Sequence, residues 1–464
     1  MRSRGRRMSD DLASVWVMSA LDALRGRLSG LLRLPDDAAF DEARRPWNLS
    51  VEQRPAAVAE PAGVDDLVAL LAFAREEGVA LAVQPCGHGA ASALEGAVLV
   101  RPRAFDALEI DQEARIARIG AGVGWGAVID ALDGTGLVAP AGTSRVVSAT
   151  GYTLGGGHSW FSRSAGLGSD ALRAAWIVRP DGTHERVDDA SDPETMWALR
   201  GAGGIAGIVT EIEIDLVAAP VLVGGSIVFD SAHSVDALRA VRDLAAVAPL
   251  SLNLFATSMR MPDVPQLPEA IRARSFLTVD VLAIDEAAAE FLEPIRAAAP
   301  VEREDFGHTT PALMASRSAE PTDPTPTRGV SSALRSLDDA LLDDLLTFRA
   351  LPEQAPLVGL GLRMLGGALD SPRREGFASL SDAAWLVHGL APVAPGAPRE
   401  PGDASLAGLR EILGRADEAP LVPTFLAPEE TLERAGTRAD LDRLRAIRER
   451  VDPDAVLHEG RLPR

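Results

Sequence analysis

The 464-residue sequence contains no lysine, a single cysteine and a single tyrosine, and aromatic residues make up 4% of it. Without lysine the chain cannot form a Schiff base with pyridoxal phosphate or build a Walker-type phosphate loop. The single cysteine, Cys86, excludes an internal disulfide and a cysteine-rich metal site. No run of eighteen apolar residues is free of charge, so the sequence predicts no membrane span.

The charge balance argues against a nucleic-acid partner. Acidic residues outnumber basic residues by 67 to 46, a formal net charge of −21 that repels phosphate backbones. Apolar residues account for 47% and charged residues for 24%, as is usual in globular proteins. The basic N-terminus is followed at once by Asp10 and Asp11 rather than by an apolar stretch, so we predict a cytoplasmic protein.

The chain divides into segments of different pattern, with these predicted bounds: 1–44, 45–218, 219–419 and 420–464. We expect the first to be helical because leucines recur at helical spacing, at Leu21, Leu24, Leu28 and Leu31. The stretch 309–329 is rich in proline, threonine and serine, which predicts a mobile loop or lid. The final helix is expected to stop at Pro453.

Three glycine-rich stretches lie in the first half, at 87–92, 141–157 and 201–207. None is a Rossmann fingerprint, because the strand, turn, helix and later acidic residue of that motif are missing. Glycine lets backbone N–H groups approach a phosphate closely. In an acidic chain without lysine, such donors are a sensible way to hold a pyrophosphate.

Three blocks in order carry a family resemblance: RPAAVAEPAGVDDLVALLAFAREEGVALAVQPCGHG, then GTSRVVSATGYTLGGGHSWFSRSAGLGSDAL, then ETMWALRGAGGIAGIVTEIEI. They resemble the FAD-binding PCMH-type domain of the vanillyl-alcohol-oxidase superfamily, in its berberine-bridge-enzyme-like branch of oxygen-dependent FAD-linked oxidoreductases. The resemblance covers about residues 50–220 and returns weakly at 363–369 and 448–457.

The resemblance implies an α+β fold. Residues 45–218 would form a two-subdomain PCMH-type FAD-binding domain. Residues 219–419 would form a substrate domain with an antiparallel sheet backed by helices, and 420–464 would return to the FAD domain. The flavin ring would then lie between the two domains.

The resemblance also implies a set of cofactor-binding residues. They are Gln84, Pro85, Cys86, Gly87, His88, Gly89, Ala90, Gly142, Thr143, Ser144, Ser148, Thr150, Gly151, Tyr152, Gly155, Gly156, Gly204, Gly207, Ile208 and Val209. Asp170 and Arg200 resemble positions that brace these loops.

His88 stands where many relatives bond covalently to the flavin 8α-methyl group, and the alternative is a histidine that only packs nearby. A neutral imidazole is a suitable nucleophile for that carbon. Relatives with a second bond use a cysteine, and Ser144 stands at that position and cannot form a thioether. We therefore expect FAD held by one covalent bond, through His88, while Cys86 is expected to be a small buried side chain.

His158 is the predicted catalytic residue. It follows the glycines where several relatives carry a tyrosine, and it could act as general base or only donate a structural hydrogen bond. The single tyrosine, Tyr152, leaves a second catalytic tyrosine of those relatives without a counterpart. His388 and His458 are the candidate substitutes. The remaining histidines are widely spaced, and we predict no metal site.

The sequence thus predicts an FAD-dependent oxidoreductase, in first place an oxidase. It would remove a hydride from a C–H next to oxygen or nitrogen in a small-molecule substrate of secondary metabolism, with O2 reoxidising the flavin. A nicotinamide-dependent reductase of the same fold and a flavin-bearing, drug-binding or resistance protein without turnover are the alternatives. The sequence does not predict the oligomeric state.

Overall fold

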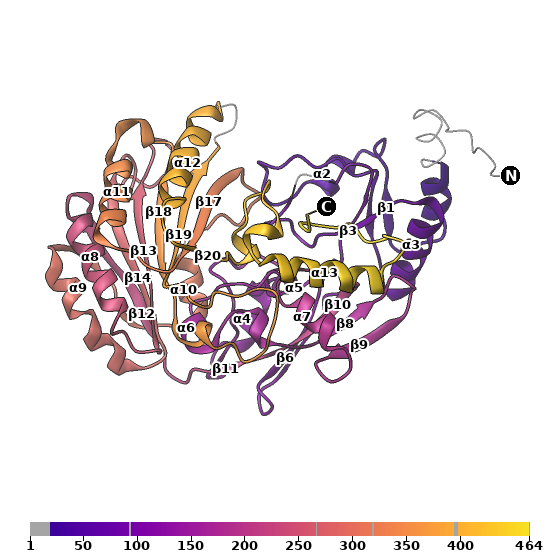
Figure 1. The fold of residues 1–464 in the computed structure, drawn as a ribbon, viewed down its shortest axis with the longest axis horizontal. Helices are drawn as coiled ribbons and strands as arrows, with labels where there is room; N and C mark the ends of the chain where they lie inside the picture. The colour runs from indigo at the N-terminus through magenta and orange to yellow at the C-terminus, as the bar shows by residue number, and fades with distance from the viewer. Residues whose placement is uncertain (1–18, 92–93, 266, 318–319, 394–397, 464) are drawn as a thin grey trace.

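The computed structural model describes residues 19–91, 94–265, 267–317, 320–393 and 398–463. Its strands fall into an N-terminal sheet, a middle sheet and a large sheet, with a short pair between the last two. Figure 1 shows the large sheet and its helices on one side of the molecule and the other two sheets on the opposite side. No helix in this described part has the length and apolar character to span a bilayer.

The N-terminal sheet has the strand order β1-β2-β4-β3. Its strands are β1 (Leu31–Arg33), β2 (Ala57–Glu60), β3 (Leu81–Val83) and β4 (Val98–Val100), and helices α2 (Phe40–Arg44) and α3 (Val64–Glu77) pack with it. The helix α3 begins with Asp65 and Asp66 in its first turn, which suits the helix dipole. It ends at Gly78, whose φ of 69° closes the helix in the left-handed conformation.

The middle sheet is antiparallel, with the order β5-β6-β10-β8-β9. Its strands are β5 (Leu108–Asp111), β6 (Ile116–Gly120), β8 (Leu172–Val178), β9 (His184–Asp188) and β10 (Ile208–Asp215). A turn at Asp181 and Gly182 joins β8 to β9. The helices are α4 (Trp125–Leu132), α5 (Ala149–Leu154), α6 (Ser162–Ala165) and α7 (Pro193–Leu199), and β7 (Leu137–Val138) pairs with β11 (Val217–Ala218).

The large sheet is antiparallel throughout its described pairings. It contains β12 (Val223–Asp230), β13 (Leu252–Arg260), β14 (Ser275–Ala283), β15 (Val301–Glu304), β16 (Gly307–His308), β17 (Thr327–Leu334), β18 (Gly359–Met364), β19 (Trp385–Pro392) and β20 (Glu418–Ala419). Helices α8 (Ser234–Ala245), α9 (Glu293–Ala298), α11 (Asp339–Ala350) and α12 (Glu400–Leu413) cover its outer face (Figure 1). The expected antiparallel sheet backed by helices is therefore confirmed.

The C-terminal segment crosses back from the large sheet to the other two sheets. Its helix α13 (Arg438–Val451) starts at a capping box of Thr437 and Asp440 and ends two residues before Pro453. Arg443 of α13 forms an ion pair with Glu194 of α7. Beyond the helix, the N–H of His458 donates to the carbonyl of Leu81 at 2.8 Å. The chain end is thus attached to the N-terminal sheet.

The prediction of a helical segment over residues 1–44 holds for residues 19–25 and for α2, but it is wrong for Leu31. Residues 1–18 lie outside the described residues, and the helix ends at residue 25. Leu31 belongs to strand β1, which pairs with β2. The Asp66 carboxylate accepts hydrogen bonds from the backbone N–H groups of Ser29 and Gly30, both at 2.8 Å. These tertiary hydrogen bonds hold the segment in an extended conformation, although the leucine spacing had predicted a helix.

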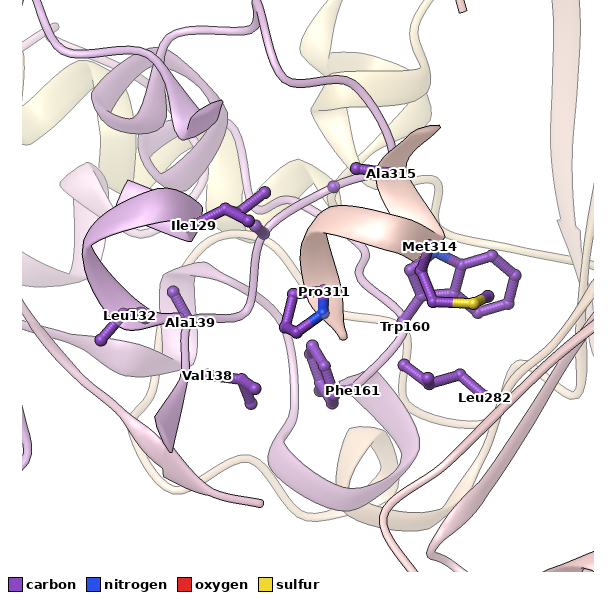
Figure 2. Close-up of a pocket in the computed structure, with 12 residues that line it drawn as sticks. Ile129, Leu132, Val138, Ala139, Trp160, Phe161, Leu282, Pro311, Met314 and Ala315 are labelled. Carbon is purple, nitrogen blue, oxygen red and sulfur yellow. The ribbon is translucent and has the colours of Figure 1, made fainter. Parts of the chain in front are cut away.

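The stretch 309–329 is also more ordered than expected. It contains the helix α10 (Pro311–Arg317) and the first residues of β17, while 318–319 lie outside the described residues. Figure 2 shows Pro311 and Met314 of α10 beside Trp160 and Phe161. Met314 is 2% exposed and belongs to the same apolar cluster as these two rings. Proline tolerates the first helical turn, so the proline-rich composition did not exclude a helix.

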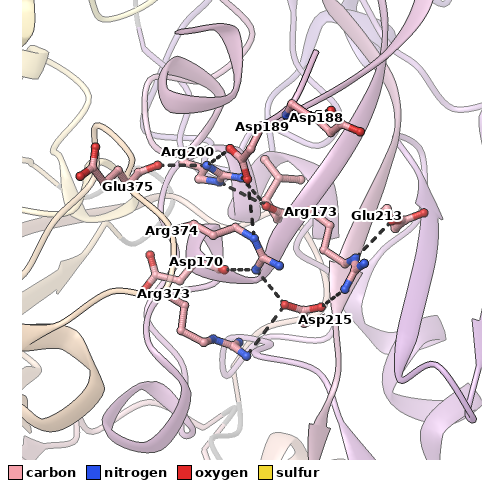
Figure 3. Close-up of polar contacts among 12 residues, drawn as sticks. Asp170, Arg173, Asp188, Asp189, Arg200, Glu213, Asp215, Arg373, Arg374 and Glu375 are labelled. Carbon is pink, nitrogen blue, oxygen red and sulfur yellow. Dashed lines mark hydrogen bonds and ion pairs between the residues drawn. The ribbon is translucent and has the colours of Figure 1, made fainter. Parts of the chain in front are cut away.

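A polar network ties the loop after β18 to the middle sheet (Figure 3). Arg374 contacts the Asp215 carboxylate at 2.7 Å and donates to the backbone carbonyl of Asp170 at 2.8 Å. The buried Arg200 pairs with Asp189 and donates to the carbonyl of Glu375. The Asp170 carboxylate also accepts a hydrogen bond from Leu167 N–H, and the bracing of the cofactor-binding loops by Asp170 and Arg200 stays a prediction. This network fixes the large sheet relative to the middle sheet.

The packing of the glycine turn before β10 against Ala378, in the loop after β18, can be tested by comparing Gly201 with Gly203. Gly201 has a φ of 132°, and a Cβ there would lie 2.4 Å from the backbone nitrogen of Ala378. Gly203 has a φ of 72°, and a Cβ there would meet nothing within 4 Å. We expect G203A to cost about 1–2 kcal/mol of left-handed strain, and G201A to cost about 1–3 kcal/mol more through overpacking. Urea unfolding measures both, and equal losses would contradict the close packing at Gly201.

Candidate functional site

A cavity of about 480 Å³ lies where the three sheets meet. Its walls come from the loops that follow β3, from the stretch 142–158, from the glycine turn before β10, and from the C-terminal segment. The large sheet contributes Arg363 of β18, and Glu320 comes from the segment after α10. All three glycine-rich stretches named from the sequence therefore reach one cavity.

Most of the predicted cofactor-binding residues line this cavity. They are Gln84, Pro85, Cys86, Gly87, His88, Gly89, Gly142, Thr143, Ser144, Ser148, Thr150, Gly151, Tyr152, Gly155, Gly204, Gly207 and Val209, and the predicted catalytic residue His158 joins them.

Ala90, Gly156 and Ile208 are not among the lining residues. Ile208 lies on a strand whose side chains alternate, so it faces the apolar core while Val209 faces the cavity. Gly156 is close against the C-terminal segment, where a Cβ would lie 2.7 Å from Val422. Ala90 is 2% exposed. The sequence pattern placed these three residues next to the cavity wall but did not predict the direction in which each one points.

The imidazole ring of His88 is positioned by a stacking contact on one face and by a contact at one ring nitrogen. Its ring stacks on Trp47 with centroids 4.0 Å apart, and its Nδ1 lies 3.1 Å from the Sγ of Cys86. Its Nε2 is buried and has no hydrogen-bond partner among the described residues. Burial lowers the pKa of His88 to about 4, so the ring is neutral at pH 7. Cys86 is half-buried and lines the cavity, in contrast to the fully buried side chain that was expected.

The loop that carries His88 is shaped by the buried Arg101. Its guanidinium donates to the carbonyls of Gln84 at 3.0 Å and Pro85 at 3.4 Å, and on its other side to the carbonyl of Arg45 at 2.9 Å. Desolvation lowers the pKa of Arg101 to about 10, which still leaves it charged at pH 7. The loop is thus tied to the chain segment that also carries Trp47.

His158 and Tyr152 lie at the inner end of the cavity. Both nitrogens of His158 and the hydroxyl of Tyr152 are buried without a partner among the described residues. Burial, assisted by the charge of Arg363, holds the pKa of His158 well below its ordinary value. Burial likewise raises the pKa of Tyr152. Gly157 gives the Tyr152 ring its space, since a Cβ there would lie 2.3 Å from the ring.

Arg363 is a cavity residue that the site prediction missed. It sits on β18, with its guanidinium carbon 4.4 Å from the Phe255 ring centroid and 5.3 Å from that of Phe425. The His158 ring lies 5.6 Å from Phe255 and 6.4 Å from Phe425. The only signal in the sequence was the weak return of the resemblance at 363–369, which begins at this arginine.

Of the remaining histidines, one lines the cavity and four do not. His458 lines the cavity, whereas His388 lies behind Phe425, with ring centroids 6.2 Å apart. The Nδ1 of His388 contacts the Ser331 hydroxyl at 2.7 Å, and burial lowers its pKa to about 4. The other three, His184, His233 and His308, are exposed or half-buried and do not line the cavity.

Comparison with known proteins agrees with this geometry. Residues 55–188 match the family described as an FAD binding domain. This segment is similar to that FAD binding domain. The chain is 31% identical to (R)-6-hydroxynicotine oxidase of Paenarthrobacter nicotinovorans over 195 residues, which is 42% of this chain and 43% of that oxidase. The alignment therefore spans less than half the length of that relative.

Two solved structures show the fold of the whole chain. The wild-type BBE-like 1 protein of Physcomitrella patens superposes with a TM-score of 0.83 at 16% identity, covering 96% of this chain and 99% of that one. Glucooligosaccharide oxidase from Acremonium strictum, described with a 6-S-cysteinyl, 8α-N1-histidyl FAD, has a TM-score of 0.78 at 19% identity and the same coverage. The expected resemblance to PCMH-type flavoproteins is confirmed for the domain and the fold.

The low pKa of His388 makes a testable contribution to stability. In the unfolded chain a histidine titrates near 6.5, and in the folded protein His388 titrates near 4. The unfolded state therefore binds more protons between these values, so stability is full above pH 6.5 and is lost as the pH falls toward 4.

We expect H388Q to reduce the slope of unfolding free energy against pH in that window by about one proton. Urea unfolding at several pH values between 4 and 7.5 measures the slope. H308Q removes an exposed histidine and serves as the matched control. An unchanged slope in H388Q would contradict a neutral, desolvated His388.

Proposed function

We propose that this protein is an FAD-dependent oxidoreductase, and specifically an oxidase of a small molecule. The observation that carries the proposal is the arrangement of the cavity. Loops of an FAD-binding domain form one side of it, and a separate large sheet closes it with Arg363. Such a chamber can hold a cofactor against one wall and a substrate against the other, and proximity supplies a large part of catalysis.

The residues present fit FAD. Buried polar atoms near the cavity have no partner among the described residues, and each could bond to a ligand: His88 Nε2, Thr150 Oγ1, Tyr152 OH, His158 Nδ1, His158 Nε2 and Thr424 Oγ1. Buried polar atoms are normally bonded, so this concentration supports a polar ligand. The glycines of the three stretches let backbone donors approach it, and no lysine is needed.

Two of the three histidines that line the cavity, His88 and His158, have separate roles in this proposal. His88, neutral and with Nε2 free, would hold FAD by a single covalent bond to the 8α position. His158, also neutral, would accept the proton of a substrate hydroxyl or amine. FAD bound there would supply the hydride acceptor and pass the electrons on to O2. A secondary-metabolite substrate and a cytoplasmic location remain predictions.

The first test is the colour of the purified protein after acid precipitation. We expect a yellow pellet, because a covalent flavin stays with the denatured chain. In H88A the colour should move to the supernatant, with loss of nearly all pellet-bound flavin. C86S keeps the imidazole and should keep the colour in the pellet, which separates the histidine from its neighbouring sulfur.

Other results would change the proposal. Covalent flavin retained in H88A would contradict the attachment through His88. Flavin that is bound but released by acid from the wild type would leave the FAD site and remove the covalent bond. A protein that stays colourless after addition of FAD would contradict the oxidoreductase itself.

A further inference from the structure

We propose that the substrate of this cavity carries a carboxylate and that Arg363 binds it. The inference rests on the proposed function, because it assigns the large-sheet side of the cavity to the substrate. It narrows the substrate to a small organic acid whose oxidised carbon lies near the acid group.

Arg363 is positioned by flat hydrophobic faces. The ring of Phe255 on β13 and the ring of Phe425 in the C-terminal segment both contact its guanidinium, at 4.4 Å and 5.3 Å from their centroids. Phe255 is itself held by stacking on Trp160 at 3.7 Å. Aromatic faces attract a guanidinium and fix its plane without using its N–H donors.

Those donors have no acceptor among the described residues, since no hydrogen bond or ion pair there involves the Arg363 guanidinium; its backbone pairs within the sheet. The contrast with the other arginine that lines the cavity is direct. Arg461 donates to the backbone carbonyls of Ala427 at 2.6 Å and Glu430 at 2.7 Å, so its N–H donors are used within the protein. Arg363 keeps its planar fork available to a ligand.

Burial lowers the pKa of Arg363, and the charge of Glu320 opposes this shift without forming an ion pair. A desolvated guanidinium with no direct anionic partner is costly, which argues that an anion completes the site. Glu320 is the only carboxylate among the described residues that line the cavity. It is exposed and accepts a hydrogen bond from the Thr143 hydroxyl, and it forms no ion pair with Arg363. A carboxylate matches the guanidinium fork with two parallel hydrogen bonds.

The location of Arg363 favours a substrate over the cofactor as the source of the anion. It extends from the large sheet, whereas the predicted cofactor-binding residues extend from loops of the other two sheets. Its charge also acts on His158, whose ring lies near both phenylalanines. A substrate anchored at Arg363 would therefore extend toward the proposed base.

The test compares carboxylates with their neutral amides of nearly equal shape. Isothermal calorimetry on the holoenzyme would titrate benzoate against benzamide, and acetate against acetamide, to cover two sizes. We expect at least one acid to bind about tenfold or more tightly than its amide, as fits a charge-assisted pair. R363M should abolish this preference, R363K should keep part of it, and amide binding should change little.

R303M is the matched control, because Arg303 is an exposed arginine on β15 of the same sheet and lies outside the cavity. It should leave the preference intact. Equal binding of acid and amide by the wild type, or no binding of either pair, would overturn the proposal. So would a preference that survives in R363M.

The carboxylate site and the proposed oxidoreductase function are tested by different measurements, so failure of one can be told from failure of the other. Flavin content and colour test the oxidoreductase, and the ratio of acid to amide affinity tests Arg363. If Arg363 serves the flavin instead, R363M would lower flavin retention or shift the flavin potential while the ratio stayed unchanged in all variants. That result would overturn the carboxylate site and leave the oxidoreductase standing.

Discussion

Hydrogen bonds from buried guanidinium groups to carbonyls in loops and at strand ends hold this cavity together. Arg101 binds the loop before His88, Arg163 donates to Leu252 and Ala248 at 3.0 Å, and Arg200 donates to Leu172 at 2.9 Å. A guanidinium carries five donors and can satisfy several carbonyls that no helix or sheet uses. Because a buried carbonyl left without a donor costs about 1–3 kcal/mol, each of these arginines constrains its loops strongly. The absence of lysine is consistent with this, since an ammonium lacks the fixed fork.

These bonds also set the distance between the walls of the cavity. Arg163 lies after the 142–158 stretch but also donates to the carbonyl of Leu365, directly after β18. Arg200 lies before the glycine turn and holds the carbonyl of Glu375. The segment 365–376 is therefore bonded to the middle sheet at both ends. Movement of the large sheet away from the FAD-binding loops would break both sets of bonds, so the chamber is preformed.

The sequence allowed the FAD-binding half to be predicted because its signals are local. The glycine-rich stretches and the three motif blocks are continuous in the sequence and need no knowledge of distant partners. Where long-range contacts decided the structure, prediction failed. Leu31 lies in a strand because the Asp66 carboxylate binds the backbone N–H of the preceding residue, Gly30. The helix α10 forms in a proline-rich stretch because Met314 packs into an apolar cluster. Arg363 was missed for the same reason, since only folding brings it between two phenylalanines.

The low pKa values in and behind the cavity follow from the same constraint. His88 and His388 have pKa values lowered to about 4 by burial, and no carboxylate lies close enough to raise them. The charged side chains that line the chamber among the described residues are Arg363, Arg461 and Glu320, so the lining has an excess of positive charge, although the chain as a whole carries −21. The acidic surface and the positively charged cavity lining are therefore separate features. A small anion would gain from the guanidinium without having to displace any protein partner, whereas a cation would meet its repulsion in a site of low dielectric.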